Sequence, residues 1–341
     1  MTAGADPSAS TVVGLDLGGT KISAAVVSPD GRTTSPRSRR EHSNAGPTAV
    51  VREIVDLVRE VLRASDSPLV ALGIGAAAQV DESTGVVHHA PNLRWRDFGL
   101  GAAVREALEI PVSVLNDARA ATLGEWRFGA GKGVDDLLVV FVGTGVGGSV
   151  VAGGRLLEGA AGAFGEVGHS ILFAGGRKCH CPGRGCLEAY VGGWAIAERA
   201  REALVDRPGE GSILRAEAER VGSLGAEAVG RAATAGDPVA RRLVQETSEW
   251  LGQGVAGLVN SFNPARVVLG GGVVEGWPEL VGAVDRAIQA HCQPPAAAAV
   301  DVRAVALGHD AVLIGAAAFA RGRLALPSSD GPGPNRASTL T

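Results

Sequence analysis

A histidine and three cysteines in one short stretch form the clearest group of residues that could hold a metal ion. His169 is followed by Cys179, Cys181 and Cys186, and the whole chain has only four cysteines. Three thiolates and one imidazole suit tetrahedral Zn²⁺, and four protein ligands leave no open position for a reactive water. The pattern predicts a structural zinc site, with His180 as the alternative fourth ligand. Reduced cysteines buried without a metal are the other interpretation.

Two glycine-rich stretches could bind phosphate groups through backbone N–H groups. They contain Asp16, Gly18, Gly19, Thr20 and Lys21 in DLGGTK, and Gly143, Thr144, Gly145, Gly147 and Gly148 in GTGVGG. Glycine permits positive φ and close approach, so successive amides can form a nest that binds an anion. A tight β-hairpin with no ligand is the alternative for each stretch.

The second stretch has the G-x-G-x-x-G spacing of a dinucleotide-binding turn, but that turn requires a helix after it. A strand-like run, SVVAGGRL, follows instead, and no G-x-x-x-x-G-K-[ST] motif occurs in the chain. Phosphoryl transfer needs phosphates held in place, charge neutralised by Mg²⁺ and an aimed nucleophile. Two facing glycine turns could bind the phosphates, with Asp16 orienting Mg²⁺ through water.

Asn116 and Asp117 stand where an expected strand, VSVL, gives way to a helical pattern. Both residue types are preferred at helix N-caps, which is one interpretation. The other is that Asp117 accepts the proton of an attacking hydroxyl group.

Short β-branched runs alternate with helical patterns, which is typical of an α/β fold. Strands are expected at 11–17, 22–27, 69–75, 112–115, 137–142, 149–153, 265–270 and 302–307. Apolar residues at 51, 54, 55, 58, 61 and 62 share one helical face, and further helices are expected near 187–204, 223–262 and 277–291. These elements must position the glycine turns, because each turn follows directly on an expected strand.

The two glycine stretches have similar settings. Residues 14–27 and 141–153 each read as a strand, a turn containing glycine and threonine, and a second strand. Their first glycines, Gly18 and Gly143, lie 125 residues apart, close to the length of one domain. We therefore expect two related lobes that face each other across a cleft.

Composition and charge exclude several classes of protein. The 341 residues suffice for two packed domains. A net charge of −4 gives no basic field for nucleic acid or anionic lipid. The N-terminus has neither the basic start nor the apolar run of a signal peptide, and no run of about 18 apolar residues occurs. We expect a cytoplasmic protein with disordered ends at 1–10 and 327–341.

Taken in order, DLGGTK, GTGVGG, GEVGH with the cysteine cluster, and GGGV at 270–273 resemble the ROK family (repressors, open reading frames and kinases), most of all its sugar kinases such as bacterial glucokinase. The resemblance covers roughly residues 12 to 322. It implies the actin-like ATPase fold, with two ribonuclease-H-like lobes and a cleft between them. An N-terminal lobe, 11–116, would regain the C-terminal helix 309–324, and 117–308 would form the larger lobe with the zinc loop.

The same resemblance assigns roles to residues. Asp117 would be the catalytic base, and the sugar would contact Asn92, Asn116, Asp117, Glu166, His169 and Glu188. ATP would be bound by the two glycine stretches above together with Gly270, Gly271 and Gly272. The zinc histidine of the family lies in GEVGH, which favours His169 over His180. The implied cofactors are ATP, Mg²⁺ and structural Zn²⁺.

The implied reaction is ATP-dependent phosphorylation of a hexose at its 6-hydroxyl, with glucose expected first. N-acetylglucosamine and N-acetylmannosamine are alternative substrates, and polyphosphate is an alternative donor. Ala77 and Ala78 stand where the family's sugar kinases have Pro-Gly, which bears on the choice of sugar. A sugar-sensing regulator is less favoured, since only about eleven residues precede the DLGGTK strand, too few for a helix-turn-helix domain. Homodimers or homotetramers are expected from the family.

Overall fold

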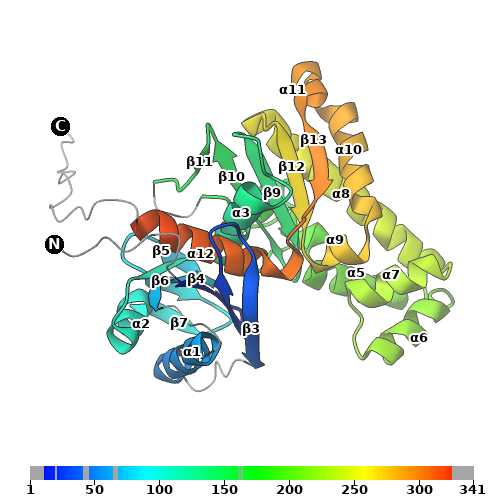
Figure 1. Ribbon diagram of the computed structural model, residues 1–341. Helices are drawn as coiled ribbons and strands as arrows, with labels where there is room; N and C mark the ends of the chain where they lie inside the picture. Colours follow the sequence, from blue (N-terminus) through cyan, green and yellow to red (C-terminus); the bar gives the residue numbers. More distant parts are fainter. Residues whose placement is uncertain are drawn as a thin grey trace, which may run out of the picture.

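The computed structural model describes residues 11–19, 21–40, 46–63, 68–160, 162 and 164–324, and it contains two five-stranded sheets (Figure 1). The first sheet has the strand order β3-β2-β1-β4-β8. Its strands are β1 (Thr11–Leu17), β2 (Lys21–Val27), β3 (Thr33–Arg40), β4 (Leu69–Ala76) and β8 (Val112–Asn116). β1 runs antiparallel to β2 and parallel to β4, and β4 runs parallel to β8. The parallel strands β1, β4 and β8 therefore end at the same edge of the sheet.

The second sheet repeats this arrangement with the order β11-β10-β9-β12-β13. Its strands are β9 (Leu137–Val142), β10 (Val146–Ala152), β11 (Arg155–Leu156), β12 (Arg266–Gly270) and β13 (Asp301–Ala304). β9 runs antiparallel to β10 and parallel to β12, as β1 does to β2 and β4. The shared strand order confirms the expectation of two halves with related architecture.

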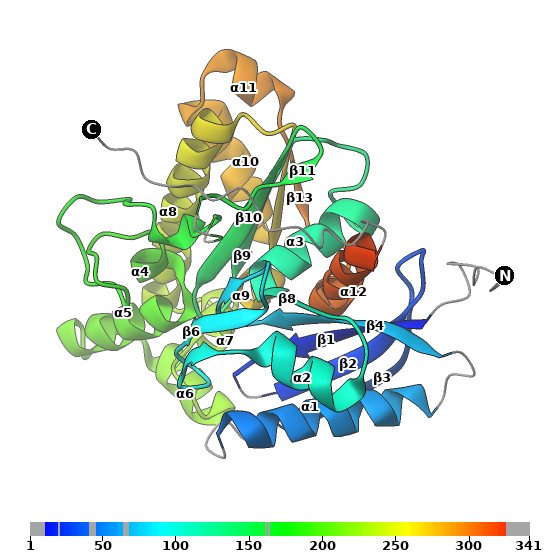
Figure 2. The same ribbon diagram turned by 90° about the vertical axis from the view of Figure 1, so that its left-hand side faces the viewer.

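Helices flank both sheets (Figure 2). On the first sheet, α1 (Pro47–Leu62) and α2 (Leu100–Leu108) lie beside a small sheet of β5 (Gln79–Asp81), β6 (Val86–Ala90) and β7 (Trp95–Phe98). The other helices are α3 (Asp117–Phe128), α4 (Glu188–Val191), α5 (Gly193–Asp206), α6 (Ser212–Val221), α7 (Ala226–Thr234), α8 (Pro238–Phe262), α9 (Gly272–Gly276), α10 (Glu279–His291), α11 (Pro294–Ala299) and α12 (Ala311–Leu324), with 3₁₀ turns η3 (Val167–His169) and η4 (Gly308–Asp310). No helix in the described ranges is long and apolar enough to cross a membrane.

Helices α3 and α12 lie between the two sheets (Figure 2). α12 packs against β1 and β4, while Leu123 of α3 is buried in a cluster with Leu137 of β9. The two helices touch through their backbones, because a Cβ placed on Gly315 would lie 1.7 Å from the carbonyl oxygen of Ala120. Only glycine permits so close an approach. The crossing therefore fixes the position of α3, whose first residue is Asp117, relative to the first sheet.

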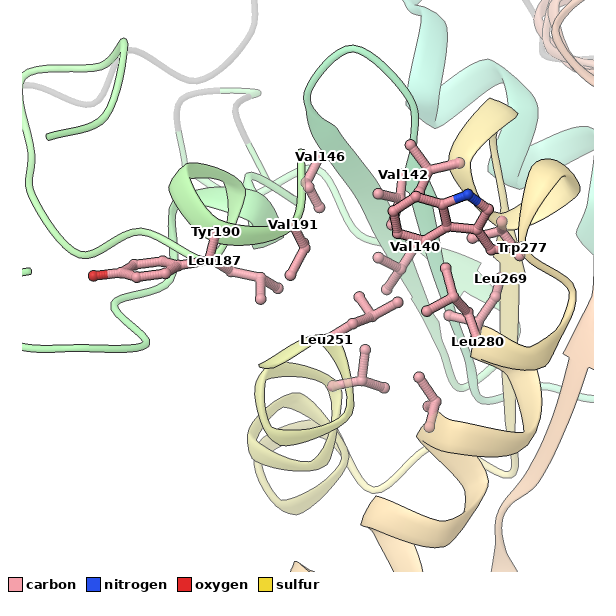
Figure 3. Packing of buried hydrophobic residues seen from close by; sticks show 14 of the residues in the cluster. Val140, Val142, Val146, Leu187, Tyr190, Val191, Leu251, Leu269, Trp277 and Leu280 are labelled. Atoms are coloured by element: carbon pink, nitrogen blue, oxygen red, sulfur yellow. The ribbon is translucent and has the colours of Figure 1, made fainter. Parts of the chain in front are cut away.

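The larger core lies between the second sheet and α8 (Figure 3). In this view Val140 of β9 and Leu251 of α8 point toward one another, and Trp277 lies beside Leu269 of β12. Trp277 is 2% exposed, and its indole N–H donates to the carbonyl oxygen of Ala226. Full burial of side chains of this size contributes roughly 1.5–3 kcal/mol each. This packing holds the ends of β9, β10 and β12, where two of the glycine stretches lie.

Several element boundaries differ from the prediction. β10 begins at Val146 and not at 149, so Gly147 and Gly148 lie in the strand, where they pair with Phe141 and Val140. β13 ends at Ala304, and β3, the small sheet and α2 were not predicted. The division into lobes at 116 and 117 stays a prediction. The ends expected to be disordered, 1–10 and 327–341, lie outside the described residues.

Candidate active site and metal cluster

The ends of the three parallel strands of the first sheet bring the candidate catalytic residues together. Leu17 of β1 pairs with Ala76 of β4, and Ala76 pairs with Asn116 of β8. The chain leaves the sheet directly after this row, so Asp117 and the stretch beginning at Ala77 lie at one edge. Asp16, one residue before Leu17, pairs with Gly75 of β4, which pairs with Leu115 of β8, so Asp16 lies one row before the ends of these strands.

Asn116 is the N-cap of α3, and Asp117 is the first residue of the helix. The Asn116 Oδ1 accepts from the Arg119 amide at 3.1 Å, while its Nδ2 donates to the Ala78 carbonyl oxygen at 3.2 Å. The Asp117 Oδ1 accepts from the Ala118 amide at 2.8 Å and from Asn116 Nδ2 at 3.1 Å. The neighbouring residue thus performs the capping, and no described residue donates to the Asp117 Oδ2. This oxygen is available to a ligand.

Both carboxylates are perturbed by burial. Burial raises the pKa of Asp117 to about 6, although hydrogen bonds from Ala118 and Asn116 favour the ionised form. Burial also raises the pKa of Asp16 to about 7, and the charge of Asp117 adds to this, while Lys21 and His309 lower it. Carboxylates with pKa values near neutrality can take up a proton and release it.

A cavity of about 400 Å³ opens beside Asp117. Its wall includes the stretch after β4, His88 of β6, the start of α3, and the chain around β10 and Glu166. Among the lining residues are Ala78, Gln79, Asn116, Arg119, Gly147, Gly148, Phe164 and Glu166. This volume is at the small end of the range for ligand sites. Of the expected sugar contacts, the lining includes Asn116, Asp117 and Glu166, but not Asn92, His169 or Glu188.

The segment with the unexpected alanines forms part of this wall. The Ala77 amide donates to the Leu17 carbonyl oxygen at 3.1 Å, and the Ala78 carbonyl accepts from Asn116 Nδ2. Ala78 is buried, with 7% of its surface exposed. This segment therefore runs against β1 and α3. Its Ala78 carbonyl holds the side chain of Asn116, the residue next to the candidate base.

The first glycine turn joins β1 to β2. The Gly18 amide donates to the Lys21 carbonyl oxygen at 3.1 Å. A Cβ on Gly19 would lie 2.7 Å from the Cβ of Asn92, so Asn92 is placed over this turn and away from the cavity lining. Thr20 lies outside the described residues, so its expected contact with the nucleotide stays a prediction.

The second turn, at Gly143, Thr144 and Gly145, is attached to the start of α5. The Gly193 amide donates to the Gly143 carbonyl oxygen at 2.9 Å, and the Trp194 amide donates to that of Thr144 at 3.1 Å. Both bonds are accepted by carbonyl oxygens of the turn. With its carbonyl groups bound to α5, the turn is suited to present N–H groups to an anion.

The strand glycine Gly148 has a different role from the turn glycines. A Cβ on Gly165 would lie 2.5 Å from the Gly148 carbonyl oxygen, and a Cβ on Gly148 would lie 2.8 Å from the Val167 side chain. Small residues therefore let the GEVGH segment lie directly on β10. This contact brings Glu166 to the cavity.

A third glycine stretch follows β12 in the second sheet. Gly271 has φ of +89°, and a Cβ there would lie 2.5 Å from the Val142 carbonyl oxygen, at the end of β9. Gly272 then begins α9 and lines a larger cavity of about 770 Å³, which Trp277 and the helices α6 and α7 also border. The second and third glycine stretches therefore lie at one edge of the second sheet, and the third borders a wide hollow.

The predicted metal ligands are brought together. One ligand atom each from His169, Cys179, Cys181 and Cys186 can be chosen so that all lie within 4.8 Å of one another. The Cys181 and Cys186 sulfurs are 3.6 Å apart, and the Cys179 sulfur is 3.7 Å from Nδ1 of His169. Zn–S bonds of about 2.3 Å and Zn–N bonds of about 2.0 Å give tetrahedral edges of roughly 3.5–3.8 Å. The donor set and its spacing therefore fit a tetrahedral metal bound through Nδ1.

His180, the alternative ligand, is used differently. Its ring stacks on Trp194 with centroids 3.9 Å apart and an interplanar angle of 19°. The fourth cysteine, Cys292, lies elsewhere and donates to the Ala256 carbonyl oxygen. The four residues that lie together and could hold a metal ion are thus the four that were preferred from the sequence.

Two carboxylates lie near the cluster. The Nε2 of His169 is 3.8 Å from the Glu166 carboxylate, so the ring lies between the cysteines and a cavity residue. Glu188 accepts from the Val146 amide at 2.9 Å and from the Trp194 indole at 3.3 Å. Glu188 therefore connects α4 to the second glycine turn and to α5. Its expected contact with sugar stays a prediction.

Arg119 is a charged residue of the cavity lining that was not predicted, and neither was its partner Glu82. Arg119 is 2% exposed and forms an ion pair with Glu82, whose side chain is 6% exposed. A single arginine within the alanine-rich start of the helix, DARAA, was the available signal, because a charged residue among small apolar ones requires a partner when it is buried.

The ROK family model matches residues 12–323 of the chain. The chain is 35% identical to a glucokinase of Halalkalibacterium halodurans over 307 residues, which cover 89% of this chain and 92% of that protein. It is 33% identical to an N-acetylmannosamine kinase of Escherichia fergusonii, over 92% of this chain and 99% of that protein. The structure is similar to that of a ROK family glucokinase from Streptomyces griseus in complex with glucose and AMPPNP, with a TM-score of 0.78, 32% identity, and coverage of 92% and 99% of the two chains.

Proposed function

Because the chain belongs to the ROK family, we propose that it is an ATP-dependent sugar kinase that phosphorylates the 6-hydroxyl of a hexose, with glucose as the first candidate. The observation that carries this proposal is the partly buried Asp117 at the start of α3, with one carboxylate oxygen unused by described residues and a cavity of about 400 Å³ beside it. Glucokinases at 33–35% identity support glucose as the substrate.

In this mechanism Asp117 acts as the general base. Its pKa of about 6 leaves it mostly ionised at neutral pH and able to accept the proton of the attacking hydroxyl group. Asn116 holds the other carboxylate oxygen in place through Nδ2, which limits the rotation of the carboxylate. Glu166, on the opposite wall, would accept hydrogen bonds from sugar hydroxyls and so orient the ring.

The nucleotide would be held at the glycine stretches, with its phosphates between the two lobes and its nucleoside toward the hollow bordered by Gly272. Asp16 is the residue suited to orient Mg²⁺, and its pKa of about 7 fits a carboxylate that gains from a nearby cation. When bound, Mg²⁺ would neutralise charge on the transferred phosphoryl group. We also propose that Thr20 contacts the nucleotide.

We assign structural Zn²⁺ to His169, Cys179, Cys181 and Cys186, supported by their spacing. Four protein ligands give the metal no open position, so its effect is to fix the loop and the His169 ring. With Nδ1 on the metal, Nε2 is directed toward Glu166 and is able to donate a hydrogen bond to the sugar or to that carboxylate.

N-acylhexosamines are the second candidate substrates, supported by the relative that phosphorylates N-acetylmannosamine by name and by Ala77 and Ala78 in the cavity wall. A cytoplasmic location, a homodimer or homotetramer, and ATP in preference to polyphosphate complete the proposal, all from the family.

A coupled assay of ADP formation tests the function and the substrate together. Purified protein with Mg²⁺ and ATP is offered glucose, mannose, fructose, N-acetylglucosamine and N-acetylmannosamine, and polyphosphate replaces ATP in a parallel series that detects the sugar phosphate. The highest kcat/KM is expected for glucose with ATP. Absence of turnover with every sugar and both donors would reject the proposed kinase activity.

A further inference from the structure

Arg119, which lines the proposed sugar cavity, forms a buried ion pair with Glu82. The Arg119 Nε donates to Oε1 of Glu82 at 2.5 Å, and its Nη2 donates to Oε2 at 3.2 Å. Both side chains are almost fully excluded from solvent. A two-point pair between planar groups fixes orientation as well as distance, which a lysine cannot reproduce.

The same guanidinium joins segments that are far apart in sequence. Its Nη1 donates to the carbonyl oxygen of Leu157, which follows β11 in the second sheet. Glu82 follows β5, and its own carbonyl oxygen accepts from Arg323 of α12 at 2.7 Å. Arg119 therefore ties the segment after β4 and β5 to α3 and to the second sheet.

The tied segment is the one that departs from the family. Residues 77–82 contain the two alanines at the Pro-Gly positions, and Ala78 and Gln79 line the cavity with Arg119. Alanine lacks the fixed φ of proline, so the segment needs other restraints to keep one path. The restraints include the hydrogen bonds of the Ala77 amide and the Ala78 carbonyl at its start and the pairing of β5 with β6 in its middle. At its end the Glu82 ion pair adds a side-chain restraint.

We infer that Arg119 is a positioning residue for the sugar: through Glu82 and Leu157 it holds the 77–82 segment in the path that binds the hexose. This inference rests on the proposed sugar kinase function. Since the pair lies on the sugar side, its loss weakens hexose binding and leaves the nucleotide side intact.

The test compares Arg119→Lys and Glu82→Gln with a matched control, Arg266→Lys. Arg266 also forms an ion pair, to Asp301 at 3.1 Å, and donates to the Ala130 carbonyl oxygen at 2.9 Å, but it does not line either cavity. For each purified protein the KM of the hexose, the KM of ATP, kcat and the Tm are measured. Hexose binding to the same proteins is measured by calorimetry without ATP.

We expect Arg119→Lys and Glu82→Gln to raise the hexose KM and Kd by about tenfold or more, with kcat and the KM of ATP changed by less than about threefold. The double variant should lose less than the product of the single effects, because both substitutions break one interaction. Arg266→Lys should lower the Tm without changing the hexose KM. Glu82→Gln provides the same test where Arg119→Lys does not fold.

Unchanged hexose KM and Kd in the folded Arg119 and Glu82 variants, with a lower Tm like that of the control, would show a purely structural pair and overturn the inference. An equal rise of the KM values for hexose and ATP would overturn it as well. A wild-type protein that neither binds nor phosphorylates any hexose would instead reject the proposed function itself, so the two failures are distinguishable.

Discussion

Replacing Asp117 by asparagine separates the chemical role of this carboxylate from its effect on stability. Asparagine keeps an oxygen that can accept from the Ala118 amide and from Asn116, so the start of α3 should be preserved. It cannot accept the proton of a hydroxyl group. We expect kcat to fall about 10²–10⁴-fold, the usual contribution of a general base, with little change in the hexose Kd.

The same substitution should stabilise the fold at high pH. Burial raises the pKa of Asp117 from 3.8 to about 6, and each pKa unit corresponds to about 1.4 kcal/mol, so the ionised carboxylate destabilises the native state by at most about 3 kcal/mol. Because the folded pKa is the higher one, the stability linked to this group is fully present below about pH 4 and is lost as the pH rises through 6. The free energy of unfolding of the variant should therefore be larger than that of the wild type at pH 8 and equal to it near pH 4.

Two assays check these expectations. A coupled assay at saturating ATP gives kcat, and urea unfolding at pH 8 and pH 4 gives the difference in the free energy of unfolding. A variant with kcat within tenfold of the wild type would refute the assignment of the base. A variant no more stable than the wild type at pH 8 would refute the claim that this site holds a desolvated charge.

Three further predictions concern other parts of the molecule. In the wild type, kcat/KM should fall by about tenfold per pH unit below about pH 6, as protonation removes the ionised Asp117; a flat profile down to pH 5 would contradict this. Cys181→Ala should contain no zinc by atomic absorption, where the wild type contains one ion per chain, and should bind hexose at least about tenfold more weakly; a normal sugar KM in zinc-free protein would disprove the role given to the metal cluster. Gly315→Ala should lower the Tm sharply because the new Cβ would lie 1.7 Å from the Ala120 carbonyl oxygen, whereas Gly322→Ala on the same helix, with nothing within 4 Å, should leave it unchanged or raise it; equal Tm values would mean that the helices can separate at no cost.

The parts of the fold that could be predicted are those with strong local patterns. β1, β4 and β9 are mostly apolar and mostly buried, and their boundaries agree closely with the prediction. The small sheet was not predictable in this way, because β5 and β7 have three and four residues and mix apolar with charged side chains. The exposed β3, TTSPRSRR, has no apolar pattern and is a strand only because it pairs with β2.

In the site, too, the residues that could be predicted lie close together in sequence, and those that could not lie far apart. The metal ligands lie within eighteen positions of one another, so their spacing in sequence already limited the geometry. Sequence could not distinguish a cap from a base at Asn116 and Asp117, and the structure gives the cap to Asn116. Arg119 and Glu82 are 37 residues apart in sequence, and only the folded chain brings them together.

The related halves of the molecule are alike in backbone and unlike in charge. When the first turn is aligned with the second, 125 residues later, Asp16 corresponds to Phe141, which pairs with Gly147 and Gly270. One sheet edge therefore carries carboxylates, and the equivalent edge of the other sheet carries an aromatic ring and glycines. The carboxylates at the first edge repel an anionic donor unless a cation is present, whereas the carboxylate beside the second turn, Glu188, already accepts hydrogen bonds from the Val146 amide and the Trp194 indole. In the proposed reaction, the half with the carboxylates would therefore accept the proton, and the half without them at its strand ends would hold phosphates.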